Sequence, residues 1–352
     1  MRAAWSILGL TLLACGGASA LVDDLDAGGG AGDGALAPDG ASPDARLAVP
    51  DAPTGEPDAR PEAGADGGGQ ADAGSDAGAV DAGGDAGGRV AVLPRSTGTC
   101  PQFAASGMIT VAPSGVAPRN ARLWISAAAA TMDGPVVFYW HGTGNTTAEA
   151  VYGLGNAQIN AVLAQGGVVI APEHDPAAGI LPWFLASGVR DDDLRVADEL
   201  LACAAMRVGV NAQRIHSVGL SAGGIHTSVM SFRRASYLAS VVTYSGGLVV
   251  PTAPPSDAPR ARFAAMILHG GADDRVPPLP VSFQVTSESY ARVTKGQGHF
   301  PVLCDHGMGH SIPAAVRASA LRFLQDHPYG VSPWPYAGGL PAGFYAQCAL
   351  VP

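Results

Sequence analysis

Short runs of hydrophobic residues alternate with amphipathic segments along this chain from about residue 96 onward. The runs are bounded by Gly, Pro, Asn or Asp, which is typical of buried strands. We predict strands at 108–112, 121–126, 136–140, 168–171, 215–218, 240–244, 263–269 and 300–304. Helical spacing of apolar positions predicts helices at 147–164, 191–206, 225–232, 279–293 and 312–325. This alternation predicts an α/β domain over residues 96–352, with a mostly parallel central sheet and helices on both faces.

Residues 1–15 predict an export signal of the lipoprotein type. An apolar run at 7–13 follows Arg2 and is too short to span a bilayer. The run ends in Leu-Leu-Ala-Cys, which resembles a bacterial lipobox and predicts a lipid on Cys15. Such a lipid would anchor an exported protein to the cell envelope without a transmembrane helix. The alternative is an ordinary signal peptide cleaved near Ala20, which would release the protein as an extracellular one.

Residues 16–95 consist mainly of Ala, Gly, Asp and Pro, and no aromatic residue occurs between Trp5 and Phe103. Such a segment cannot bury enough apolar surface to offset the entropy of ordering it, so we predict a disordered tether. It carries 15 acidic and 4 basic residues, whereas residues 96–352 carry equal numbers of both. The tether therefore carries a net charge of −11, which with Arg2 gives the −10 of the whole chain. A neutral domain without a basic cluster argues against a nucleic-acid partner.

Residues 214–224, RIHSVGLSAGG, combine a strand, a sharp turn and the start of a helix. The turn contains Gly219, Ser221 and Gly223 in the pattern G-x-S-x-G. At such a turn the serine hydroxyl projects away from the sheet, and side chains at the flanking positions would collide with their surroundings. The pattern predicts that Ser221 is a nucleophile. The N–H group of Ala222, at the helix start, would then be one donor of an oxyanion hole.

Five segments in order resemble the α/β-hydrolase fold and, within it, secreted polyhydroxybutyrate depolymerase-like and feruloyl or acetylxylan esterases. The segments lie within 135–328 and are VVFYWHGTG, VVIAPEHD, the run from DDDLRVADELL to VGLSAGG, ILHGGADDRVP and GMGHSIP. The resemblance implies an acid and then a histidine after the serine. By this pattern Asp273 aligns as the acid, with Asp274 as the alternative, and His310 aligns as the general base.

Two further histidines, His299 and His306, compete with His310 for the role of base. The spacing of four between His306 and His310 could also suggest a metal site on a helix. Gly307 and Gly309 argue against a helix there. We therefore expect neither a metal nor a cofactor.

The His-Gly-Thr-Gly segment after the predicted strand at 136–140 contains small residues, which let the backbone approach a substrate. We predict that Gly142 or Thr143 supplies the second oxyanion donor. Trp140, His174 and Trp183 are candidates for lining the substrate cleft, although aromatic residues near strand ends equally often pack in the core.

Four cysteines remain besides the predicted lipidation site, and an exported protein meets an oxidising environment. The even number suits two disulfides, for which three pairings are possible. We favour Cys100–Cys348, which would join the two ends of the domain, together with Cys203–Cys304. Free buried thiols are the alternative.

The sequence thus predicts a serine carboxylic-ester hydrolase that works through an acyl-enzyme. The resemblance implies polyesters, feruloylated or acetylated polysaccharides, or small acyl esters as substrates. A membrane partner is expected only through the N-terminal lipid. A peptidase of the same fold, or a non-catalytic surface lipoprotein that binds polysaccharide or a partner, would be the alternatives.

Overall fold

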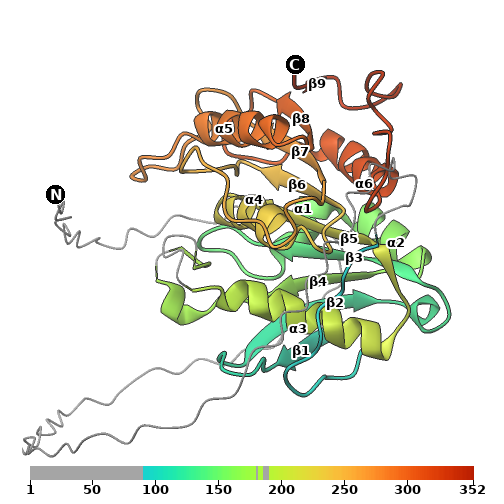
Figure 1. The fold of residues 1–352 in the computed structure, drawn as a ribbon. Helices are drawn as coiled ribbons and strands as arrows, with labels where there is room; N and C mark the ends of the chain where they lie inside the picture. The colour runs from blue at the N-terminus through green and yellow to red at the C-terminus, as the bar shows by residue number, and fades with distance from the viewer. Residues whose placement is uncertain (1–89, 180, 185–189) are drawn as a thin grey trace, which may run out of the picture. The chain divides into compact units, whose positions relative to one another are not determined.

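The computed structural model describes residues 90–179, 181–184 and 190–352 (Figure 1). The predicted signal, its Cys15 and the tether up to residue 89 lie outside the described residues. The folded unit begins a few residues earlier than predicted, because Ala91 is buried and the N–H of Val92 donates to the carbonyl oxygen of Ser236 at 2.9 Å. Within the described part of the chain, no helix has the length and apolar character needed to cross a membrane.

A single mixed sheet forms the centre of the unit, and nine of the described segments contribute strands to it. The strands are β1 (Gly107–Val111), β2 (Arg119–Ile125), β3 (Gly134–Trp140), β4 (Val168–Pro172), β5 (Val210–Leu220), β6 (Ser240–Tyr244), β7 (Ala264–His269), β8 (Phe300–Asp305) and β9 (Cys348–Leu350). Their spatial order is β1-β2-β4-β3-β5-β6-β7-β8-β9. Strands β4, β3 and β5 to β8 pair in parallel, whereas β1, β2 and β9 pair antiparallel at the edges.

Helices cover both faces of the sheet, as predicted. The helices are α1 (Glu149–Leu154), α2 (Asn156–Ala164), α3 (Asp192–Arg207), α4 (Ala222–Arg233), α5 (Phe283–Gly296) and α6 (Arg317–Asp326), with short 3-10 turns η1 (Ala127–Ala130), η2 (Pro176–Ala178) and η3 (Ala314–Val316). The buried side chains of α3, α4 and α5 join one apolar cluster, and those of α1, α2 and α6 join a second cluster on the other face (Figure 1). The strands between these layers are buried on both faces, which explains their continuous apolar sequence.

Backbone chemistry moves several boundaries away from the predicted ones. The helix predicted at 147–164 is broken into α1 and α2 at Gly155, which has a φ of +88°. The helix predicted from residue 279 begins only at Phe283, because prolines at 277, 278 and 280 precede it. The last strand, β9, follows a Pro- and Gly-rich segment and was not predicted.

Both predicted disulfide pairings are wrong. The structure joins Cys100 to Cys203 and Cys304 to Cys348. Cys304 and Cys348 lie directly opposite each other in the antiparallel pair of β8 and β9. Cys203 lies on α3, and its bond to Cys100 fastens the segment before β1 to that helix. The sheet thus pairs Cys304 with Cys348, and Cys100 is left to pair with the helix.

Candidate active site

Ser221 occupies a strained turn between β5 and α4, as the glycine pattern predicts. Its φ of 57° is positive, which is uncommon for a residue other than glycine. A Cβ atom at Gly219 would lie 2.3 Å from the carbonyl oxygen of Gly223, and one at Gly223 would lie 1.9 Å from that of Trp140. The N–H of Ser221 donates to the carbonyl oxygen of Tyr244 on the neighbouring strand at 2.9 Å. The turn is thus held by close packing on both sides, and only glycine fits at either flanking position.

His310 contacts a carboxylate, but the carboxylate belongs to Asp274 and not to Asp273. His310 Nδ1 lies 2.7 Å from Asp274 Oδ1. The side chain of Asp274 is fully buried, whereas Asp273 is exposed. The predicted assignment of Asp273 is therefore corrected to the alternative. The turn after β7 directs Asp274 inward, where its N–H also donates to the carbonyl oxygen of Gly271 at 3.1 Å.

Further hydrogen bonds fix the Asp274 carboxylate from the opposite side. Its Oδ2 accepts from Ser245 Oγ and from the Gly270 N–H, both at 2.8 Å. The loop that carries His310 is close to the same backbone, since the Gly309 N–H donates to the Gly270 carbonyl oxygen at 3.0 Å. A Cβ atom at Gly270 would lie only 1.8 Å from the Gly309 carbonyl oxygen. Both loops follow neighbouring parallel strands, β7 and β8, so the sheet itself brings the acid and the histidine together.

The ring of His310 also packs against Phe283 at the start of α5, with centroids 4.6 Å apart. The next turn of its loop is tied to α1, because the Ile312 N–H donates to the Tyr152 hydroxyl at 3.0 Å. The side chain of His310 is 20% exposed, so it remains partly accessible from the solvent side. These contacts hold the imidazole in one orientation.

The two competing histidines have structural partners of their own. His299 stacks on Phe263 with centroids 3.8 Å apart and accepts a hydrogen bond from its N–H at 3.3 Å. His306 accepts from the Met308 N–H at 3.2 Å, and burial lowers the pKa of its ring. Neither ring hydrogen-bonds to the Asp274 carboxylate, so His310 alone of the three meets the acid.

Of the two predicted oxyanion donors after β3, Gly142 is already occupied. Its N–H donates to Glu149 Oε1 at 3.0 Å. A Cβ atom at Gly142 would lie 3.3 Å from the Ser221 Cβ, so this loop passes close to the serine. Thr143 lines the same cavity as Ser221 and Ala222, which leaves it as the remaining candidate for the second donor.

Glu149 is a buried acid that the sequence analysis missed. Its Oε1 accepts hydrogen bonds from the Gly142 N–H and the Tyr139 hydroxyl, each at 3.0 Å. Its Oε2 is buried and has no hydrogen-bond partner among the described residues. Burial raises the pKa of this carboxyl. In the sequence it is an ordinary first-turn glutamate, and no local signal marks it as part of the site.

A cavity of about 320 Å³ begins at Ser221 and continues along α4. Its lining is mostly aliphatic, and the described residues that form it are Thr143, Leu181, Ser221, Ala222, Ile225, Val229, Leu248, Val249, Val250, Thr252, Pro254, Leu279, Val281 and Phe283. The size is typical of small-molecule sites. A cleft that exposes the Ser221 side chain to an apolar chamber suits a substrate with a hydrophobic part.

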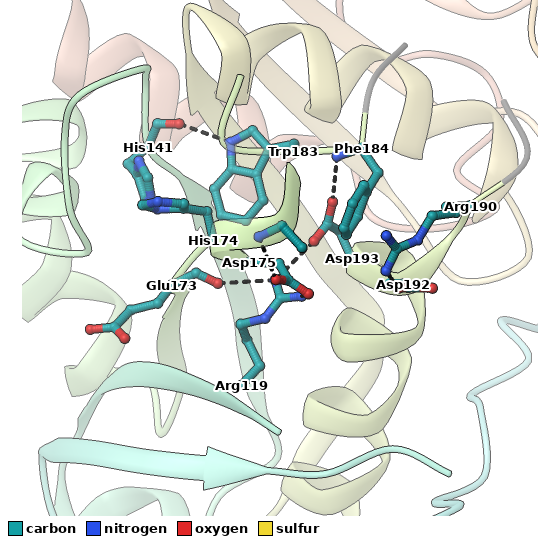
Figure 2. Close-up of polar contacts among 11 residues, drawn as sticks. Arg119, His141, Glu173, His174, Asp175, Trp183, Phe184, Arg190, Asp192 and Asp193 are labelled. Atoms are coloured by element: carbon teal, nitrogen blue, oxygen red, sulfur yellow. Dashed lines mark hydrogen bonds and ion pairs between the residues drawn. The ribbon is translucent and has the colours of Figure 1, made fainter. Parts of the chain in front are cut away.

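The aromatic residues predicted to line the cleft lie elsewhere. Trp140 and Trp183 are buried and pack edge to face, with centroids 4.9 Å apart. Trp140 Nε1 donates to Ser217 Oγ at 3.0 Å. Trp183 Nε1 donates to the carbonyl oxygen of His141 at 2.9 Å (Figure 2). His174 Nδ1 lies 3.3 Å from His141 Nε2. None of them lines the cavity at Ser221, and Trp183 instead binds the backbone of His141, two residues before Thr143.

A buried ion cluster holds this support in place (Figure 2). Arg119 lies between two carboxylates, at 3.1 Å from Asp175 Oδ2 and 2.9 Å from Asp193 Oδ1. The second oxygen of Asp193 accepts from the Phe184 N–H at 2.8 Å. A buried charge is tolerated only beside an opposite charge. The cluster therefore ties β2, α3 and the segment after β4 to one another. The density of acids at the start of α3 is thus explained by structure and not by catalysis.

One group of potential metal ligands occurs among the described residues, formed by Cys100, Glu199 and Cys203. The two sulfur atoms form a disulfide, so neither is a thiolate. The Glu199 carboxylate accepts hydrogen bonds from the N–H groups of Thr97 and Gly98 at 2.7 and 3.0 Å. These residues therefore close a loop and do not offer a metal site.

No protein-family model matches the chain, and no curated protein matches it significantly. Solved structures do resemble it. A serine-to-alanine variant of pOPH in complex with pNPB has a TM-score of 0.58 at 18% identity, over 73% of this chain and 97% of that chain. Native sOPH has a TM-score of 0.57 at 18% identity, over 73% and 97%. A serine-to-cysteine variant of pOPH with DMSO has a TM-score of 0.57 at 19% identity, over 72% and 96%. With the sheet order and the serine turn after β5, these likenesses show that the chain has the α/β-hydrolase fold.

Proposed function

We propose that this protein is a serine carboxylic-ester hydrolase in which Ser221, His310 and Asp274 act together. The observation that carries the proposal is the buried carboxylate of Asp274 at 2.7 Å from His310 Nδ1, on loops that follow adjacent strands of the sheet bearing the Ser221 turn. A bond at Nδ1 leaves Nε2 as the proton acceptor, which is the tautomer that a general base requires. The likeness to pOPH, of which a serine-to-alanine variant forms a complex with pNPB, agrees with this proposal.

In the proposed reaction the Ser221 hydroxyl attacks the ester carbonyl carbon while His310 Nε2 takes its proton. The carbonyl oxygen becomes an oxyanion that accepts hydrogen bonds from the backbone N–H groups of Ala222 and Thr143. The intermediate collapses when His310 returns the proton to the leaving alkoxide, which departs as the alcohol. Water, deprotonated by His310, then hydrolyses the acyl-enzyme and restores Ser221. Asp274 orients the imidazole and stabilises its charged form throughout.

The proposal is tested with Ser221→Ala and a fluorophosphonate probe. We expect the wild type to hydrolyse p-nitrophenyl esters and to take up the probe at Ser221, and the variant to lose both activities while keeping its circular dichroism spectrum. Full residual hydrolysis in the variant would refute the proposal. An unlabelled, inactive wild type would support a non-catalytic binding protein instead. A peptidase is separated by comparing p-nitrophenyl esters with peptide p-nitroanilides.

We also propose that a lipid on Cys15 anchors the protein to the bacterial cell envelope. The support is the Leu-Leu-Ala-Cys sequence after a short apolar run. Intact-mass measurement of the mature protein is expected to detect a diacylglyceryl adduct, whereas an unmodified start at Leu21 would contradict the proposal.

A further inference from the structure

The cavity beside Ser221 has an unusually uniform chemical character. None of the described residues that line it is charged, and apart from Ser221 itself the polar side chains are those of Thr143 and Thr252. The remaining walls are Leu, Ile, Val, Ala, Pro and one Phe. Transfer of aliphatic groups from water into such a chamber is favourable in proportion to the area buried, whereas a charged group would lose its hydration without a partner.

The cavity follows one face of α4 away from the serine. Ala222, Ile225 and Val229 are spaced by three and four residues, so they lie on the same side of the helix. Val229 is eight residues from Ser221, which corresponds to about 12 Å along the helix axis. Val229 is only partly buried, whereas residues 222–228 and 230–232 of α4 are buried, and Val229 lines this cavity. The cavity therefore extends along α4 at least from Ser221 to Val229, and this stretch is the channel.

The lining also indicates which half of an ester enters the channel. It includes Ser221 and both proposed oxyanion donors, Ala222 and Thr143, but not His310. A leaving alcohol must lie next to His310, because that residue protonates it. Phe283 stands between the two regions, since it lines the channel and packs on the His310 ring. The acyl side of the carbonyl is the side that continues from the oxyanion donors into the channel.

Resting on the proposed ester hydrolysis, we propose that this channel is an acyl-binding site for linear, uncharged aliphatic chains of medium length. With carbon–carbon bonds of about 1.5 Å in a zigzag, each bond advances the chain by about 1.3 Å, so an extended chain of roughly nine to ten carbons covers the distance to Val229. An acetyl group would leave the channel empty. A feruloyl group would carry a phenolic hydroxyl into aliphatic walls. The channel therefore favours medium-chain acyl esters over acetylated and feruloylated substrates.

The experiment measures kcat/KM for p-nitrophenyl acetate, butanoate, hexanoate, octanoate, decanoate and palmitate, and for methyl hexanoate against methyl ferulate and methyl 3-hydroxybutanoate. We expect kcat/KM to rise about fourfold per methylene up to octanoate or decanoate and then to fall. Val229→Trp, which blocks the channel, is expected to lower the decanoate-to-acetate ratio at least tenfold. Val229→Ala is expected to raise the palmitate-to-decanoate ratio, and this variant provides the test if the tryptophan variant does not fold. Val285→Trp is the matched control, because Val285 is exposed on α5 and does not line the channel.

A fluorophosphonate label on Ser221 separates the two levels of the argument. If the wild type is labelled but prefers acetate, ferulate or 3-hydroxybutanoate, the acyl-site proposal is overturned while ester hydrolysis stands. Unchanged chain-length ratios in folded Val229 variants would overturn it as well. If the wild type takes up no label and cleaves no ester, the proposed function fails and the acyl site fails with it.

Discussion

His310 Nδ1 lies 2.7 Å from Asp274 Oδ1, and Asp273, the residue before Asp274 in the chain, is exposed on the outside of the same turn. Two neighbouring carboxylates thus have opposite surroundings. Asp274 also accepts hydrogen bonds from Ser245 Oγ and the Gly270 N–H, so its charge is compensated within the protein. This difference provides a direct test of the acid.

Replacing each of the two aspartates by asparagine in turn is expected to have unequal effects on kcat/KM. Asp274→Asn should lower kcat/KM for a p-nitrophenyl ester by about 10³- to 10⁴-fold, because an amide no longer holds the imidazole in the required tautomer. Asp273→Asn should leave kcat/KM within about twofold, since surface substitutions have small effects. Thermal unfolding of both variants controls for misfolding. Equal losses in the two variants would contradict the assignment of Asp274.

Glu149 is expected to position the loop that carries Thr143. Glu149→Ala removes the acceptor of the buried Gly142 N–H, so the loop should shift and kcat should fall about 10- to 100-fold. Glu149→Gln keeps an acceptor oxygen for this N–H and should recover most of kcat. Steady-state kinetics with one ester, at matched folded fractions from circular dichroism, give the comparison. A glutamine variant as impaired as the alanine variant would indicate that the charge matters and not the hydrogen bond.

The observed disulfides predict which peptides stay joined without reductant. Non-reducing peptide mapping should link Cys100 to Cys203 and Cys304 to Cys348, which close loops of 103 and 44 residues in sequence. Replacing either pair by serine should lower the free energy of unfolding by roughly 2–4 kcal/mol, because the unfolded chain gains entropy. Denaturant titration of each double variant measures this loss. Recovery of a peptide joining Cys100 to Cys348 would contradict the structure.

His226 is expected to make the protein sensitive to acid. Its ring is buried against Trp140, with centroids 4.2 Å apart, and burial lowers the pKa to about 4. The unfolded chain binds this proton near pH 6.5, whereas the folded protein does so only near pH 4. The stability that depends on a neutral His226 is therefore complete above pH 6.5 and is lost as the pH falls toward 4, by about 3 kcal/mol.

Replacement by phenylalanine isolates this effect, because the aromatic packing is kept and the titrating group is removed. The His226 Nε2 atom has no hydrogen-bond partner among the described residues, so the replacement leaves none unsatisfied there. Guanidinium unfolding at pH 7.5 and at pH 4.5 should show a smaller loss for His226→Phe than for the wild type. An identical loss in both proteins would assign the acid sensitivity to other groups.

The features that could be predicted from the sequence are local. Apolar runs and helical spacing placed most strands and helices, because the period of burial repeats within each segment. The G-x-S-x-G pattern located the turn at Ser221. A Cβ atom at either flanking glycine would collide with nearby backbone, so the turn requires glycine at fixed positions in the sequence. The two helix boundaries that were predicted wrongly, at Gly155 and at Phe283, also have local causes, namely glycine and proline within the helical patterns.

Tertiary structure decided every choice between distant partners. The selection of Asp274 over its neighbour, the pairing of Cys304 with Cys348, and the capture of the Gly142 N–H by Glu149 all depend on which strands and loops lie side by side. The burial of Trp183 also depends on tertiary structure, because its indole N–H donates to the carbonyl oxygen of His141, which lies 42 residues earlier in the chain. The amino-acid sequence alone determined the fold class and the position of the serine, since these follow from contiguous residues. The acid, the disulfides and the apolar channel arise from the order of strands in the sheet, which no single segment encodes.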